Sequence, residues 1–184
     1  MGLTFLGISG SLRDASYNTV LLRTCRELAP ADVQVVIHTL HDVPLYDRDV
    51  EADGYPASVQ ALRDAIADAD ALLLASPEYN WSLSGVMKNA IDWASRGKDS
   101  PLRHKPTALL SAAGGSGGKR AQAHLRDVLG HNEVDVIDQA VGIARAWDHM
   151  DDGELTTVDH REAIAGLLVA LRAHVLDRQG SART

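Results

Sequence analysis

The chain has 184 residues with 45% hydrophobic side chains, a single cysteine and a formal net charge of −7. This length suits one domain with a real core, no apolar run approaches the length that crosses a bilayer, and a lone cysteine excludes an internal disulfide. The basic residues are scattered rather than gathered in a stripe, which argues against nucleic acid as a partner because such binding neutralises phosphates.

The first half of the chain predicts alternating strands and helices. Residues 3–9 are almost continuously apolar and end in Gly-Ser, as expected of a strand buried on both faces. They follow Met1-Gly2 with no secretory signal before them, so we expect a cytoplasmic protein. The expected elements that follow are a helix over residues 17–28, a strand over 33–37, a polar stretch, a helix over 57–69 and a buried strand over 71–75.

The second half continues the alternation. Its expected elements are a helix over residues 84–95, a strand over 107–110, a helix over 119–129, a strand over 134–137, a helix over 159–176 and a frayed tail over 179–184. The five alternations predict one doubly wound α/β domain spanning residues 1–184, with helices on both faces of a parallel sheet. Ligands of such sheets lie beyond the carboxyl ends of the strands, so chemistry is expected in the loops after the first, third and fourth strands.

Loop 1, residues 10–18 with the sequence GSLRDASYN, is a candidate phosphate site. The amino terminus of a helix offers free N–H groups and a partial positive charge. Ser11, Ser16 and Asn18 can add side-chain donors, and Arg13 can add a charge-assisted contact. The loop matches neither the Gly-x-Gly-x-x-Gly nor the Walker signature. An ordinary strand-to-helix turn capped by Ser16 therefore stays open as the alternative.

Loop 2, residues 76–85, places Tyr79 and Trp81 beside a proline and an amide. Such groups at the carboxyl end of a strand can border a flat heteroaromatic ring, and backbone N–H groups there can reach its polar edge. The alternative is a structural loop whose two aromatic side chains fill a hydrophobic gap or a subunit contact.

Loop 3, residues 111–120, is glycine-rich, so its backbone can approach a ligand without interference from Cβ atoms. Ala113 and Arg120 stand at the first glycine and the Ser/Thr positions of a Walker motif, which disfavours ATP hydrolysis. A flexible connector is an equally open interpretation of this loop. The eight histidines form no metal-binding pattern, so no metal site is predicted.

Three segments together resemble the NAD(P)H-dependent FMN reductase family, which includes bacterial quinone, azo-dye and chromate reductases. They are GSLRxxSYN at residues 10–18, SPEYNWS at residues 76–82 and GVMKNAIDWASR at residues 85–96. The resemblance runs from residue 3 to residue 129, with weaker support beyond. It implies a flavodoxin-like fold, a five-stranded sheet with strand order 2-1-3-4-5. Ser84 departs from the family's usual proline, and Met87 from a common leucine.

The resemblance further implies FMN as cofactor, NAD(P)H as electron donor and a quinone or similar small molecule as acceptor. The residues that it assigns to the cofactor are Ser11, Leu12, Arg13, Ser16, Tyr17, Asn18, Pro77, Glu78, Tyr79, Asn80, Ser111 and Gly114. No catalytic acid or base is required, because the cofactor carries the hydride chemistry. We expect Glu78 to have a structural or backbone role rather than to act as a base.

Members of this family commonly form dimers or pairs of dimers, which predicts a homodimer or tetramer. Trp81, Trp93 and the helix over residues 84–95 are the contact candidates. Two other functions stay open, a flavodoxin-type electron carrier and a reductase that supplies free reduced FMN to a partner monooxygenase. Arg13 and the Pro-Glu-Tyr-Asn segment favour a reductase over a carrier. A receiver-type regulator is disfavoured because residues 7–10 contain no acidic side chain.

Overall fold

The computed structural model describes residues 2–181 and is built on a parallel sheet of five strands. In chain order these strands are β1 (Leu3–Ser9), β2 (Val33–His38), β3 (Ala71–Ala75), β6 (Pro106–Ala112) and β7 (Asp135–Ile143). They lie side by side in the order β2-β1-β3-β6-β7, which confirms the predicted order 2-1-3-4-5. The order reverses between β1 and β3, and a ligand site is expected at such a reversal.

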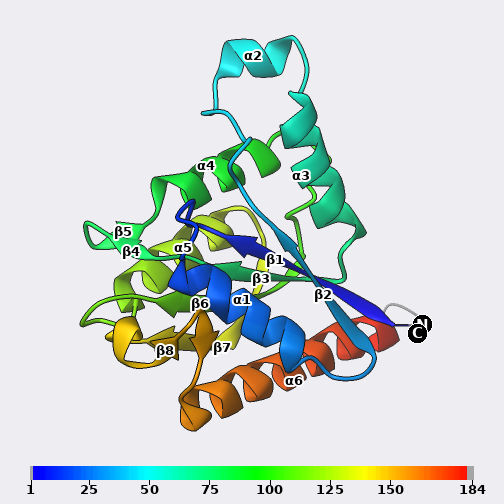
Figure 1. Cartoon of the computed structure of the whole chain (residues 1–184). Helices are drawn as coiled ribbons and strands as arrows, with labels where there is room; N and C mark the ends of the chain where they lie inside the picture. The colour runs from blue at the N-terminus through cyan, green and yellow to red at the C-terminus, as the bar shows by residue number, and fades with distance from the viewer. Residues whose placement is uncertain (1, 182–184) are drawn as a thin grey trace.

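Helices cover both faces of the sheet (Figure 1). One face packs against α1 (Tyr17–Glu27) and α6 (Val158–Ser181). The other packs against α3 (Ala57–Asp68), α4 (Gly85–Ala94) and α5 (Lys119–His131). All five residues of β3 are buried, because its successive side chains enter the two core layers in turn. The apolar runs seen in the sequence are therefore strands covered on both faces.

Several short elements were not predicted. They are α2 (Arg48–Ala52), the hairpin of β4 (Glu78–Tyr79) and β5 (Ser82–Leu83), the 3-10 helix η1 (Ala146–Asp148), and the hairpin of β8 (Met150–Asp151) and β9 (Glu154–Leu155). Each is too short to produce a hydrophobic period. β7 also extends well past the predicted end, because a register shift opposite Thr107 and Leu109 interrupts its alternation.

The predicted tail over residues 179–184 needs correction in its first part. α6 continues to Ser181, and Gln179 donates a hydrogen bond to Asp70 at 3.3 Å. The remainder of the predicted tail, residues 182–184, lies outside the described residues. Within residues 2–181, no helix has the length and apolarity needed to cross a bilayer.

Trp93 lies inside its own subunit, so the prediction that it contacts a partner is wrong. Its side chain is fully buried, and its ring meets Tyr46 edge-on with 4.9 Å between centroids. The indole Nε1 donates to the backbone carbonyl of Pro44 at 2.8 Å. Trp93 therefore joins α4 to the segment before α2. Trp81, by contrast, is 68% exposed.

Candidate functional site

The three loops meet at the carboxyl edge of the sheet, where buried polar side chains bind them to one another. The Asn18 side chain of loop 1 pairs with the backbone of Ala112 in loop 3, donating to its carbonyl and accepting from its N–H at 3.0 Å each. The Ser111 hydroxyl of loop 3 donates to the Ser76 carbonyl of loop 2 at 2.7 Å. Asn18 and Ser111 are both buried, so water does not compete for these bonds.

Ser84 supplies the remaining link, from loop 2 to loop 1. Its hydroxyl donates to the carbonyl of Gly10 at 2.7 Å and accepts from the N–H of Met87 at 3.1 Å. The same side chain is thus the N-cap of α4 and a tie to loop 1, and it is 1% exposed. A proline at this position could make neither bond. The three loops consequently form a closed ring of contacts, which we call the inter-loop bonds: Asn18–Ala112, Ser111–Ser76 and Ser84–Gly10.

A cavity of about 270 Å³ lies between these loops. Its lining residues are Ser11, Arg13, Ser16, Tyr17, Asn18, Pro77, Glu78, Tyr79, Ala112, Ala113, Gly114 and Trp147. Loop 1 contributes the polar side chains of Ser11, Arg13 and Ser16 to this lining, whereas Pro77, Tyr79 and Trp147 contribute apolar or aromatic surface. A site of this kind suits a ligand with an anionic end and a flat end.

Loop 1 leads into the N-terminus of α1, which is suited to bind an anion. Ser16 is the N-cap of α1, and its hydroxyl oxygen accepts from the N–H of Thr19 at 3.3 Å. Within residues 2–181, the N–H groups of Tyr17 and Asn18 have no acceptor. The guanidinium of Arg13 lies over the Tyr17 ring, 4.9 Å from its centroid. Free N–H groups, a helix dipole and a cation together make this end of the cavity electropositive.

Glu78 caps the N-terminus of a second helix, α5. Its carboxylate accepts from the backbone N–H groups of Arg120 and Ala121 at 3.1 and 3.4 Å, in the first turn of α5. Gly118, the N-cap residue of α5, has no side chain that could do this. Burial alone would raise the pKa of the Glu78 carboxyl, but hydrogen bonds from Ser116, Arg120 and Ala121 outweigh it and lower that pKa. A carboxylate whose charged form is stabilised in this way is a poor base.

Position 118 can accommodate only glycine. Its φ of +80° is left-handed, and a Cβ atom there would lie 1.7 Å from the hydroxyl oxygen of Ser111. Gly114 and Gly115 are different, since a Cβ atom on either would meet nothing within 4 Å. Gly117 is also constrained, with a φ of +62° and a Cβ position 3.1 Å from the backbone nitrogen of Ala144. The glycine-rich loop 3 therefore contains two constrained positions, Gly117 and Gly118, and two positions that face open space.

Most of the residues predicted from the sequence line the cavity, and three do not. Leu12 belongs to an adjacent apolar groove with Leu40 and Val43. Asn80 lies in the turn of the β4–β5 hairpin, with a φ of +48°. Ser111 lies behind the cavity wall and is fully buried. Asn18 does line the cavity, although both ends of its amide are already bonded to Ala112.

Trp147 lines the cavity from η1 and was not predicted from the sequence. It follows the last sheet strand in a segment without a recognisable motif. Ala112 and Ala113 were also missed, since they contribute backbone rather than side-chain chemistry.

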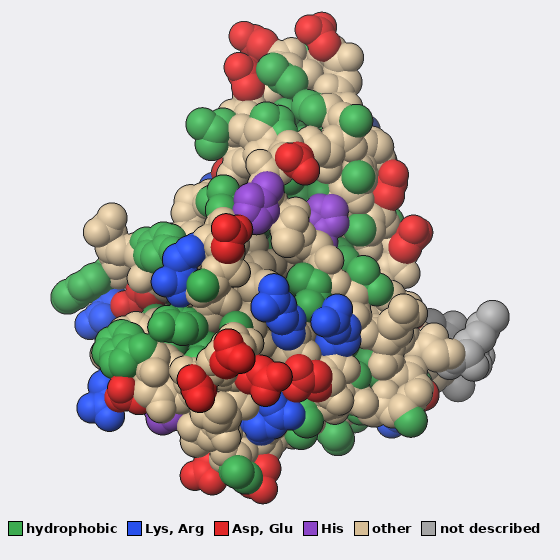
Figure 2. All heavy atoms as spheres, viewed as in Figure 1, with side chains coloured by type: hydrophobic (Ala, Val, Ile, Leu, Met, Phe, Trp, Pro, Cys, Tyr) green, Lys and Arg blue, Asp and Glu red, His purple; other side chains and the backbone are tan. Residues whose placement is uncertain are grey.

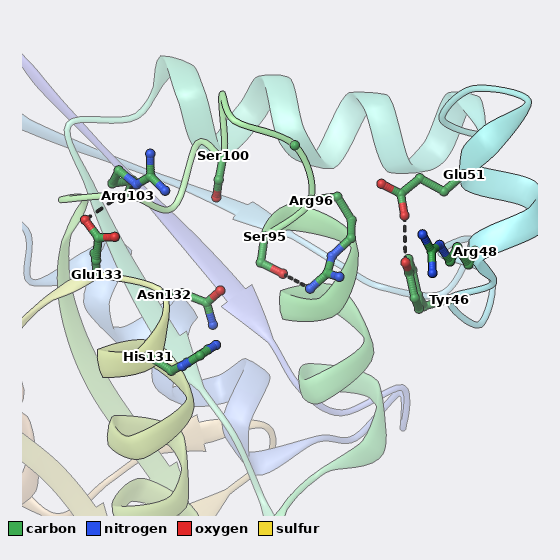
Figure 3. A pocket seen from close by; sticks show the side chains of 11 residues that line it. Tyr46, Arg48, Glu51, Ser95, Arg96, Ser100, Arg103, His131, Asn132 and Glu133 are labelled. Carbon is green, nitrogen blue, oxygen red and sulfur yellow. Dashed lines mark hydrogen bonds and ion pairs between the residues drawn. The ribbon is translucent and has the colours of Figure 1, made fainter.

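A larger cavity, of about 530 Å³, lies at the opposite ends of α4 and α5 (Figure 3). The view shows arginines and acids facing across it from three segments, and several of these are paired. Tyr46 donates to Glu51 at 2.6 Å, and Arg103 lies 3.6 Å from Glu133. No residue predicted from the sequence lines it. This cavity is therefore separate from the candidate site.

Thiol and metal chemistry find no support in the described part of the chain. Cys25 is fully buried on α1, and burial raises the pKa of its thiol to about 12, which keeps it protonated at neutral pH. Its side chain packs in the core between α1 and the sheet. Among residues 2–181, no three His, Cys, Asp or Glu side chains are grouped so that they could hold a metal ion.

Comparison with known proteins places this chain among flavin-dependent reductases. Residues 3–148 match the family model of the NADPH-dependent FMN reductases. The chain is 43% identical over 178 residues to an NAD(P)H-dependent FMN reductase of Pseudomonas aeruginosa, covering 95% of this chain and 96% of that protein. It is 45% identical over 130 residues to a quinone reductase of Escherichia coli, covering 69% of each chain.

The fold of a solved relative agrees as well. The flavoenzyme NAD(P)H:(acceptor) oxidoreductase FerB from Paracoccus denitrificans superposes with a TM-score of 0.82 at 33% identity, covering 95% of this chain and 98% of that one. The fold and the three-loop site thus define a flavodoxin-like α/β oxidoreductase. Within that class, the chain belongs to the NADPH-dependent FMN reductase family.

The charge of Glu78 should be measurable as a pH-dependent contribution to stability. A lowered pKa in the folded state means that the contribution is present at neutral pH and is lost as pH falls from 4.5, the ordinary carboxyl value, through the folded-state pKa. We expect Glu78→Gln to lower the free energy of unfolding at neutral pH by about 1 kcal/mol, as for loss of a helix cap. Below pH 4.5 the difference from wild type should shrink.

Urea unfolding at neutral and acidic pH measures both effects. Glu154→Gln, which changes an exposed carboxylate on β9, is the matched control and should leave the free energy of unfolding within about 0.5 kcal/mol. A difference between wild type and Glu78→Gln that stayed constant in acid would contradict the role given to the charge.

Proposed function

We propose that this chain uses FMN, bound in the cavity between the three loops, to pass electrons from NAD(P)H to quinones. The observation that carries the proposal is the two-ended cavity, electropositive at loop 1 and flat and aromatic at loop 2. The family to which the chain belongs is named for FMN and NADPH, and its relatives include a quinone reductase. A mononucleotide with a phosphate and a planar ring has the shape and charge that such a cavity requires.

The residues present fit FMN in their chemistry. The phosphate would be held by the hydroxyls of Ser11 and Ser16, the free N–H groups at the start of α1, and the Arg13 guanidinium. The flat ring would be bordered by Pro77 and Tyr79 from loop 2. Open space beside Gly114 leaves room for its other edge. Asn18, Ser111 and Glu78 would act indirectly, because their polar atoms already hold the loops together.

FMN, when bound, supplies a ring that takes up a hydride from a nicotinamide and releases its electrons to an acceptor. The protein's own part is to bind, orient and shield. Loop 1 sets the position of the phosphate, and the inter-loop bonds fix the other walls relative to it. No side chain of the site needs to transfer a proton. The Glu78 carboxylate is not available as a base, because it accepts hydrogen bonds from the backbone of α5.

A homodimer is also part of the proposal. Leu45 and Trp81 are 84% and 68% exposed, and Val50 on α2 is 42% exposed. α2 has no buried residue, so Val50 is not packed against the rest of the single chain. These side chains replace Trp93 as the candidates for a subunit contact. The one-domain organisation over residues 1–184 and a cytoplasmic location likewise stay predictions.

The absorption spectrum of the purified protein tests the function. We expect a yellow protein that loses its colour when NADPH is added without oxygen and regains it when a naphthoquinone follows. A yellow protein that NADPH does not bleach would support a flavodoxin-type carrier instead. A colourless protein that nevertheless reduces added FMN would support a supplier of free reduced FMN.

The phosphate assignment is tested by Arg13→Ala. Loss of one charge-assisted contact should weaken FMN binding about tenfold, without loss of folding, because Arg13 lies on the exposed side of loop 1. Arg23→Ala, which removes an exposed arginine farther along α1, is the matched control and should leave FMN affinity unchanged. Fluorescence titration of the apoprotein with FMN gives both dissociation constants, and equal values for Arg13→Ala and wild type would refute the assignment.

A further inference from the structure

Exposed aromatic side chains are concentrated at the candidate site. Tyr79, Trp81 and Trp147 are 55%, 68% and 55% exposed, whereas Phe5 and Trp93 are fully buried. Tyr79 and Trp147 both line the cavity. In Figure 2, hydrophobic side chains gather with Lys and Arg around the β4–β5 hairpin and towards β8. Exposed aromatic surface of this kind marks a place where a ligand or partner is bound.

Trp147 is held in place by its backbone neighbours. Ala146 is fully buried and its N–H donates to the Ala113 carbonyl at 3.2 Å. The N–H of Arg145 donates to the Gly114 carbonyl at 2.8 Å, and its side chain pairs with Asp148 at 2.9 Å. The two residues that precede the indole therefore fasten η1 to loop 3. The ring itself remains half exposed, so its position is fixed by the turn rather than by packing.

The sheet order places Trp147 and Tyr79 on either side of loop 3. β3, β6 and β7 are neighbours in that order, and Tyr79 follows β3 while Trp147 follows β7. Loop 3, which follows β6, lies between them and presents Gly114 to open space. The two exposed aromatic rings thus flank a stretch of bare backbone at the rim of the cavity.

The residues that line the cavity fall into a buried group and an exposed group. Ser11, Ser16 and Ala112 are at most 8% exposed and form its floor, whereas the two aromatic rings form its rim. Its volume of about 270 Å³ is at the small end for a pocket that buries one drug-sized ligand. A second planar molecule that meets the cofactor must therefore lie at the rim, in contact with exposed aromatic surface.

We propose that Trp147 is a specificity-determining residue that stacks on the planar ring of the quinone acceptor at the rim of the cavity. This inference rests on the proposed function and goes beyond it by assigning the acceptor to a residue outside the three loops. Aromatic rings attract one another at centroid distances of about 4.5–7 Å, and this attraction favours flat, uncharged acceptors. A compact inorganic acceptor such as ferricyanide has no ring to stack and gains nothing from the indole.

The test compares Trp147→Ala and Trp147→Phe with wild type, all loaded with FMN. The dissociation constant of menadione, a flat naphthoquinone, is measured on the oxidised enzyme without NADPH. Trp147→Ala should raise it about tenfold, and Trp147→Phe should return it to within about threefold of wild type. The kcat/KM ratio for menadione over ferricyanide should fall about tenfold in Trp147→Ala. Val169→Ala, an exposed apolar position on the outside of α6, is the control that should change neither quantity.

Two results would overturn the inference. One is an unchanged menadione dissociation constant in Trp147→Ala. The other is a tenfold loss of FMN affinity in that variant, which would assign the indole to the cofactor rather than to the acceptor. Failure of the proposed function gives a different result, because wild-type protein would then reduce neither acceptor with NADPH.

Discussion

The ring of inter-loop bonds is the constraint on which the candidate site depends. Loops 1, 2 and 3 come from distant parts of the chain, and the sheet alone fixes only their starting points. Asn18, Ser111 and Ser84 then bind each loop to the next with buried side-chain hydrogen bonds. A buried polar group that loses its partner costs about 1–3 kcal/mol, so the loops cannot separate without a substantial penalty. The cavity is consequently shaped before any ligand arrives.

Charge then decides which end of the cavity accepts an anion. Two helices, α1 and α5, begin beside it, and each start carries a partial positive charge. At α5 this charge is already met by the Glu78 carboxylate. At α1 the cap is the neutral Ser16, and Arg13 adds a positive charge nearby. In the proposed function, this difference would direct the FMN phosphate to loop 1 and leave the Glu78 side of the cavity for the ring.

Sequence patterns predicted the sheet, the main helices and the three loops, because buried strands and amphipathic helices leave strong periodic signals. Inside the loops the same patterns were less informative. Asn18 and Ser111 have the donors that a phosphate or ring would need, yet their polar atoms are engaged by backbone groups far away in sequence. Ser84 stood out only as a departure from the family. In the structure it is the N-cap of α4 and links loop 2 to loop 1 by a hydrogen bond to Gly10. Trp147 left no local signal, because its place at the site depends on the position of β7 in the sheet.

The most direct measurement is the FMN affinity of Ser84→Ala. Ser84 does not line the cavity, and its hydroxyl reaches it only through Gly10. If the inter-loop bonds shape the site, the folded variant should bind FMN about fivefold more weakly than wild type, as for loss of one buried hydrogen bond. Ser82→Ala, which removes a half-buried hydroxyl of the same loop that contacts His124 rather than loop 1, should bind FMN as wild type does. Unchanged FMN affinity in Ser84→Ala would contradict the account.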